Sequence, residues 1–172
     1  MIIFDSLSHP TIDNTWNNMD VGNSFKNLIK QMNEAGIDFA CAVGLHKIGS
    51  FDLEKYYQMA SATEFKNRLI PIAGFNPKEY KNARELEINL REIKKIGYKG
   101  IKIHPRYSSI NLDIDKRILI ETFNIASDLK IPVFLCSYYH TQANKFPTKE
   151  PLISLAQIFK DTPDCKIILL HG

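Results

Sequence analysis

The sequence predicts an α/β fold in which parallel strands alternate with helices. Short apolar or β-branched runs recur about every 30 to 35 residues, the length of one strand plus one crossover helix. Amphipathic helical patterns separate these runs, and such strict alternation is typical of a parallel sheet with right-handed crossovers. The predicted strands are the runs 2–4, 38–43, 69–73, 100–104, 131–136 and 166–171.

The first predicted helix is defined by signals at both of its ends. A cap at Asn23 or Ser24 begins it, and Gly36 ends it by supplying a left-handed residue. Its apolar residues follow the i, i+3, i+4, i+7 spacing that places them on one face. They are Phe25, Leu28, Ile29, Met32 and Ala35.

The same spacing predicts four further helices. Asp52 caps the second, and Gly97 ends the third. The fourth runs from about residue 115 to about residue 130, and the fifth begins near Lys149 and ends before Pro163. Their apolar faces carry Leu53, Tyr56, Tyr57 and Ala60; Ala83, Leu86, Leu90 and Ile93; Ile118, Leu119, Thr122, Phe123, Ala126 and Leu129; and Leu152, Leu155, Ala156 and Phe159.

Length and composition are those of a globular protein of one domain. The chain has 172 residues, 44% apolar and 24% charged, which is ordinary for a globular chain and predicts a single domain over 1–172. No apolar run approaches the roughly 20 residues of a membrane span. The net charge of +3 is spread along the chain, so we expect no nucleic-acid partner.

Cysteine usage and the start of the chain bear on its compartment. Cys41, Cys136 and Cys165 are odd in number and unclustered, as expected for reduced thiols. The first residues have neither a basic n-region nor a long apolar segment, so secretion is unsupported. Together these features predict a cytoplasmic protein.

Two architectures fit six strand and helix units that end on a strand. Length favours an open doubly wound sheet, because closed (β/α)8 barrels rarely have fewer than about 200 residues. Motif content favours the barrel, because the turn at residues 6–10 lacks the glycine-rich pattern with which open sheets bind nucleotides. We therefore expect a TIM (β/α)8-type barrel of which only about six units are present.

All five histidines lie at the C-terminal end of a predicted strand or in the loop after it. This edge is where parallel α/β folds place their sites. His46 and His140 fit ordinary polar loop residues, whereas His9, His104 and His171 each end a strand. Imidazole binds zinc, and a bound zinc ion lowers the pKa of its water to about 7. A hydrogen-bonded structural histidine is the alternative for His9 and His171.

Strand alternation places Lys102 on the same face as His104. In a barrel that face is the lumen. A buried lysine there could bridge metals after carbamylation or pair with a substrate carboxylate, and a lysine neutralised by a protein carboxylate is equally consistent with the pattern.

At these residues the sequence resembles the amidohydrolase-related family of metal-dependent hydrolases and decarboxylases, a branch of the amidohydrolase superfamily. The resemblance covers essentially the whole chain and implies a (β/α)8 barrel. It rests on five motifs in the order of the family, at residues 2–10, 74–77, 97–107, 131–136 and 166–172.

The resemblance also implies a metal site, and this sequence differs from the family at some of the ligand positions. His9 and His171 match family ligands, while Cys136 stands where the fifth strand has a ligand histidine. Its thiolate could replace that histidine, because zinc accepts sulfur, and a small apolar substitution without metal binding is the alternative. Leu7 replaces the first histidine of the opening motif, and the acidic residue of the eighth strand has no counterpart. Zinc binding is therefore expected to be weak or absent in this chain.

Two functions follow from these features. The first is a metal-dependent hydrolase in which a metal-activated water attacks a small, anionic substrate, with the 172-residue chain itself inactive. The second is a barrel that binds a metabolite or partner without turnover. Open sheet edges would favour a homo-oligomer. The expected substrate contacts are His104, Arg106, Lys102 and Asn76.

Overall fold

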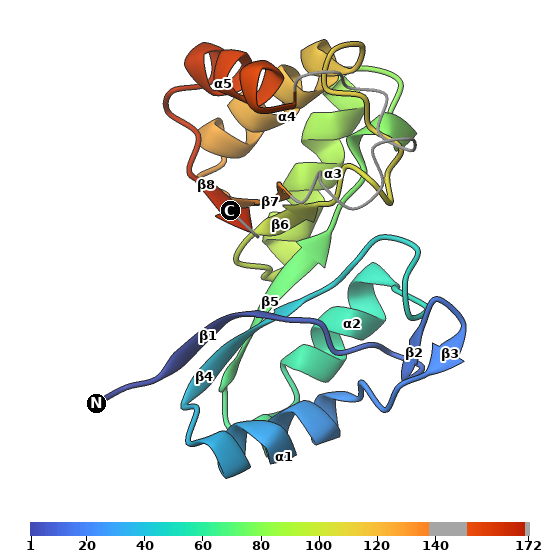
Figure 1. The fold of residues 1–172 in the computed structure, drawn as a ribbon, viewed down its shortest axis with the longest axis vertical. Coiled ribbons are helices and arrows are strands. Elements are labelled where there is room, and N and C mark those ends of the chain that lie inside the picture. The colour runs from blue at the N-terminus through green and yellow to red at the C-terminus, as the bar shows by residue number, and fades with distance from the viewer. Residues whose placement is uncertain (138–150, 171–172) are drawn as a thin grey trace. The chain divides into compact units, whose positions relative to one another are not determined.

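The computed structural model describes residues 1–137 and 151–170. The chain divides into two compact units (Figure 1), and each is described by itself. The first unit comprises Met1–Gly74 and Lys95–Lys102, and the second comprises Phe75–Lys94 and Ile103–Gly172.

The main sheet confirms the predicted α/β fold. Its strand order is β1-β4-β5-β6-β7-β8, so neighbours along the chain are neighbours in the sheet. An open doubly wound sheet reverses its order at a switch point, whereas a barrel continues sequentially. The order therefore fits six units of a TIM-type barrel. The strands are β1 (Phe4–Ser8), β4 (Phe39–Val43), β5 (Leu69–Gly74), β6 (Ile101–Ile103), β7 (Val133–Cys136) and β8 (Ile167–Leu170).

Helix α1 (Phe25–Ala35) has the boundaries that its capping residues predict. The Ser24 Oγ accepts a hydrogen bond from the Asn27 backbone N–H at 3.0 Å. Gly36 has φ 68° and ends the helix in the left-handed conformation. Of the two caps that the sequence allowed, Ser24 is the one used.

Arg68, which directly precedes β5, forms hydrogen bonds with the turn between α1 and β4. Its Nε donates to the Asp38 carbonyl oxygen at 2.9 Å, and its Nη2 donates to the Ile37 carbonyl oxygen at 2.5 Å. Its Nη1 donates to the Asn33 Oδ1 at 2.6 Å. One guanidinium thus satisfies acceptors at the end of a helix and at the entry to a strand.

Aromatic side chains fill the space between the sheet and helices of the first unit. Phe25 of α1 meets Tyr56 of α2 (Leu53–Ala60) edge to face, with ring centroids 5.0 Å apart. Phe25 also stacks on Phe65. Ala40 and Ala42 of the neighbouring strand β4 are also fully buried, so they belong to the core of this unit.

The second unit contains most of α3, together with α4, α5 and the last two strands. β7 and β8 pair in parallel, from Val133 beside Ile167 to Cys136 beside Leu170. Its helices are α3 (Ala83–Ile96), whose last two residues belong to the first unit, α4 (Lys116–Asp128) and α5 (Pro151–Asp161). The 3-10 helices η1 (Thr63–Phe65) and η2 (Pro77–Glu79) follow α2 and β5.

β1 differs from its expected range of residues 2–4. Pairing with β4 begins at Phe4 and continues to Ser8, so most of the strand is the polar stretch that follows the apolar run. β1 lies at one end of the strand order, where a strand can carry polar side chains on its exposed parts. The Asp5 carboxylate accepts hydrogen bonds from Leu7 N and Ser8 Oγ across an irregularity in this pairing.

A β-hairpin that the sequence patterns do not predict follows β1. Strands β2 (Thr15–Trp16) and β3 (Met19–Asp20) pair antiparallel. Asn17 and Asn18, which join them, have φ of 49° and 65°. Positive φ at both central residues is what a type I′ hairpin turn requires. None of the described helices combines the length and apolar content that crossing a bilayer requires.

Candidate functional site

His9 follows β1 directly and is held by the neighbouring strand. Its Nδ1 lies 2.8 Å from the carbonyl oxygen of Val43, the last residue of β4. Its ring also contacts Trp16 of the hairpin, with centroids 5.7 Å apart and planes tilted by 48°. The C-terminal ends of two strands and the hairpin thus fix the position of this imidazole.

The Val43 contact sets the tautomer of His9. A carbonyl oxygen only accepts, so the Nδ1 of His9 carries the proton. In the neutral ring the lone pair then lies on Nε2. The contact with Val43 therefore fixes both the orientation and the tautomer of the His9 ring.

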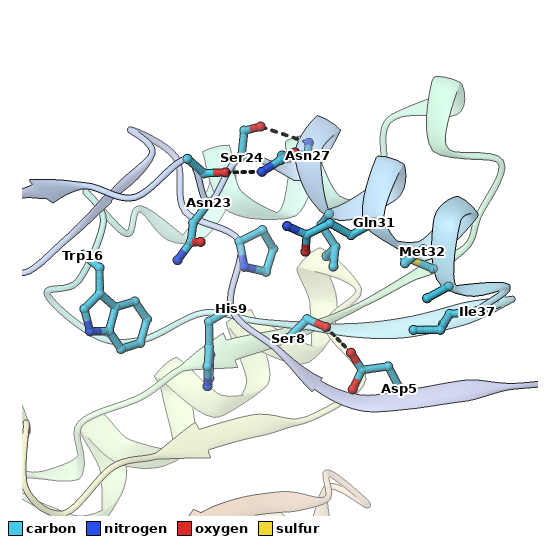
Figure 2. Close-up of a pocket in the computed structure, with 14 residues that line it drawn as sticks. Asp5, Ser8, His9, Trp16, Asn23, Ser24, Asn27, Gln31, Met32 and Ile37 are labelled. Carbon is cyan, nitrogen blue, oxygen red and sulfur yellow. Dashed lines mark hydrogen bonds between the residues drawn. The ribbon is translucent and has the colours of Figure 1, made fainter.

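A cavity of about 560 Å³ lies beside His9, between β1 and α1, and is called the His9 pocket below (Figure 2). Figure 2 shows Trp16 on one side of it and Ile37 on the other, with Asn23 and Gln31 between. Its lining comprises Asp5, Ser8, His9, Pro10, Trp16, Gly22, Asn23, Ser24, Asn27, Leu28, Gln31, Met32, Ala35 and Ile37.

Most polar groups of the His9 pocket are held in place by hydrogen bonds. The Ser8 Oγ donates to the Asp5 Oδ2 at 2.5 Å, and the Asn27 Nδ2 donates to the Gly22 carbonyl oxygen at 2.7 Å. The Ser24 Oγ accepts from the Asn27 N–H. These contacts orient the side chains before any ligand arrives, which lowers the entropy lost on binding.

The thiol nearest to this region is unreactive at neutral pH. Burial raises the pKa of Cys41 to about 11, and the nearby Asp5 carboxylate adds to this effect. Burial also raises the pKa of Cys165 to about 11. A thiol is nucleophilic as the thiolate, so neither cysteine is a nucleophile at pH 7.

Three of the expected substrate contacts lie in the second unit. The His104 ring contacts Tyr107 at 4.4 Å between centroids, and the Arg106 guanidinium lies 5.1 Å from the centre of the Tyr107 ring. Asn76 is 8% exposed, and its Oδ1 accepts a hydrogen bond from Lys78 N at the start of η2. Asn76 therefore caps a helix, while substrate binding by the three residues stays a prediction.

Lys102 is buried in the first unit. It lies on β6 beside Gly74 of β5, and its side chain is 1% exposed. Its role as a substrate contact stays a prediction.

The structure does not show the three expected metal ligands together in one site. His9 belongs to the first unit, Cys136 is buried at the end of β7 in the second, and His171 lies outside the described residues. Residues 1–137 and 151–170 contain no group of three His, Cys, Asp or Glu side chains that could hold a metal ion. A catalytic zinc needs three protein ligands, so zinc binding stays a prediction.

Most of the residues of the His9 pocket were not predicted from the sequence. Trp16, Asn23 and Gln31 carried no recognised motif. The available signal was the segment 14–23, which concentrates asparagine around the only tryptophan of the chain directly after a strand-end histidine. Turn residues and a large aromatic side chain beside a strand end are common features of binding loops.

Comparison with known proteins identifies the fold and no family. No family model matches the sequence, and no curated protein does. An uncharacterized TIM-barrel protein from Bordetella bronchiseptica matches with a TM-score of 0.75 and 18% identity, over 100% of this chain and 67% of that one. A 2,3-dimethylmalate lyase of the PEP mutase/isocitrate lyase superfamily matches with a TM-score of 0.50 and 12% identity, over 99% of this chain and 68% of that one.

These matches confirm the TIM-barrel type of fold, of which the chain has six strands. The resemblance to the amidohydrolase-related family is wrong, because the structural neighbours are an uncharacterized TIM-barrel protein and a lyase-superfamily member. Four of the five motif segments contain one of the strands β1, β6, β7 and β8, and the fifth begins at the last residue of β5. Such motifs indicate the fold and do not separate one barrel family from another.

Proposed function

We propose that this chain carries the small-molecule-binding site of a TIM-barrel-type protein and that the ligand binds in the His9 pocket. The observation that carries the proposal is the placement of His9. It follows the C-terminal end of β1, is fixed by the Val43 carbonyl, and lines a cavity of about 560 Å³.

The location and size of the His9 pocket support this proposal. TIM barrels bind their ligands at the C-terminal ends of the strands, and His9 follows such an end. Ligand pockets usually have about 300–1000 Å³ and combine apolar walls with a few placed polar groups. The His9 pocket has this composition, with Leu28, Met32 and Ile37 among its apolar residues.

The proposal concerns binding and needs no turnover. A metal-activated water acting on an anionic substrate would require a ligand set, and the described residues supply no group of three ligand side chains. The side chains that line the His9 pocket can contact a ligand directly, without a metal ion. Binding is therefore the activity that the described geometry supports best.

The test uses the indole N–H of Trp16 as a reporter, because Trp16 lines the His9 pocket and is the only tryptophan. The 15N-labelled chain is screened by NMR against mixtures of small metabolites. We expect at least one compound to shift the Trp16 signal, and His9→Ala to weaken that binding at least about tenfold.

His46→Ala is the matched control, because His46 also follows a strand but does not line the His9 pocket. We expect it to bind the compound as the wild type does. If no compound shifts the Trp16 signal, or if both histidine variants weaken binding equally, the proposal is wrong.

A further inference from the structure

The charges of the side chains that line the His9 pocket bear on the class of ligand that it can bind. Among the described residues that line it there is one carboxylate, Asp5, and no lysine or arginine. Sites for carboxylates and phosphates in proteins rely on arginine, lysine or clustered backbone N–H groups. The lining therefore favours a ligand without negative charge.

Asp5 presents a carboxylate that is already oriented. Its Oδ1 accepts from Leu7 N at 2.9 Å, and its Oδ2 accepts from the Ser8 Oγ at 2.5 Å. Each carboxylate oxygen has about two acceptor positions, so both oxygens can accept a further hydrogen bond. A ligand hydroxyl is a suitable donor, whereas a ligand carboxylate would be repelled.

The other polar groups both donate and accept hydrogen bonds. The Ser24 Oγ accepts from the Asn27 N–H, which leaves its own O–H as a donor. The Asn27 Nδ2 donates to Gly22, which leaves the Asn27 Oδ1 as an acceptor. Asn23 and Gln31 add carboxamides, which carry both functions. Hydroxyl groups also donate and accept, so they match this lining.

Trp16 and the apolar residues complete the match. The indole lies on one side of the His9 pocket and Met32 and Ile37 lie on the other (Figure 2). A flat aromatic ring packs well against a C–H face or another ring. A molecule with one apolar face and several hydroxyl groups would use both kinds of surface.

We infer that the His9 pocket binds an uncharged, hydroxyl-rich small molecule of the sugar, polyol or nucleoside type. This inference rests on the proposed function and specifies its ligand class. It differs from the anionic substrate expected from the sequence, whose expected contacts lie elsewhere, because Asp5 is the only carboxylate or fixed charge in the described lining.

The test compares ligands that differ only in charge. Neutral hexoses, pentitols, cyclitols and nucleosides are titrated against the Trp16 signal, each paired with a carboxylated counterpart such as D-glucuronate for D-glucose. We expect a neutral compound to bind at least about tenfold more tightly than its carboxylated counterpart at low salt. Asp5→Asn should reduce that preference to about threefold or less.

Asp128→Asn is the control, because Asp128 is an exposed carboxylate on α4 and lies outside the His9 pocket. It should keep the full preference for the neutral compound. The inference is overturned if the carboxylated compounds bind as tightly as the neutral ones, or if no neutral compound shifts Trp16 while another class does so. In both cases, a ligand whose binding depends on His9 would leave the proposed function intact. If no compound of any class shifts the Trp16 signal, the proposed function itself is wrong.

Discussion

The Nδ1 of His9 and the carbonyl oxygen of Val43 lie 2.8 Å apart and join the ends of β1 and β4. Val43 is the last residue of its strand, and Gly44 N continues the ladder by donating to Ile72 of β5. His9 itself is not part of the sheet, so the hydrogen bond ties the segment after β1 to the end of β4. It gives His9 a structural contribution as well as its proposed role in binding.

Two substitutions separate these contributions. His9→Ala removes the hydrogen bond to Val43 and should lower the free energy of unfolding by about 1 kcal/mol. His9→Asn keeps an amide donor near the position of Nδ1 but has no group at the position of Nε2. It should unfold close to wild type in urea while losing ligand binding. Equal loss of stability in both variants would contradict this assignment.

Gly74 is at a point of close backbone approach. A Cβ at this position would lie 2.5 Å from His46 N and 2.8 Å from Leu45 C. Backbone atoms cannot yield as a flexible side chain does, so Gly74→Ala should lower the free energy of unfolding by about 2 to 4 kcal/mol.

Gly36→Ala is the matched glycine control. A Cβ there meets nothing within 4 Å, and the only penalty is the φ of 68°. This change should cost about 1 kcal/mol in urea unfolding. If the two glycine variants lose the same free energy of unfolding, the close backbone approach at Gly74 does not make its substitution more costly than that of Gly36.

The buried thiols predict how stability changes at alkaline pH. The pKa of Cys41 rises from 9.0 to about 11 in the folded chain. Because the folded state binds this proton more tightly, the contribution is fully present below about pH 9 and is lost as the pH rises through about 11.

The free energy of unfolding should therefore fall between pH 9 and pH 10, before most tyrosines titrate. Cys41→Ala removes one of the two raised thiols, so its decline over this interval should be shallower than that of the wild type. Urea unfolding at several pH values measures both slopes. Parallel curves would show that Cys41 does not carry the effect.

Zinc binding is expected to be weak or absent. His9, Cys136 and His171 are the expected ligands, and the described residues offer no complete set. After incubation with zinc and gel filtration, elemental analysis should find no stoichiometric metal in the wild type, and His171→Ala should behave identically. One retained equivalent in the wild type that His171→Ala loses would reverse this expectation.

The helices show which parts of the fold sequence signals determine locally. Ser24 and Gly36 bound α1 as expected, and Asp52 caps α2 by accepting from the Lys55 N–H. Each of these signals acts within one turn of the chain, so the neighbouring residues contain the information. Pro163 likewise follows the end of α5 at Asp161.

β1 and the His9 pocket could not be predicted from such local signals. The polar residues of β1 form a strand because β4 offers hydrogen-bonding partners, and those partners are about 34 residues away in the chain. Placing Trp16 beside His9 depends in turn on a hairpin with two asparagines at positive φ. The strand-end position of His9 could be predicted from the sequence, but the side chains around it depend on loop conformation.

Arg68 makes the corner between α1 and β4 a single cooperative unit. Its guanidinium engages Asn33, Ile37 and Asp38 at once, so none of these contacts can open fully while the other two hold the side chain in place. Local opening of this corner then requires the helix end and the strand entry to separate together from the start of β5. Amide hydrogens on the two sides of the turn would consequently exchange with solvent through one shared opening event, although they belong to different secondary-structure elements.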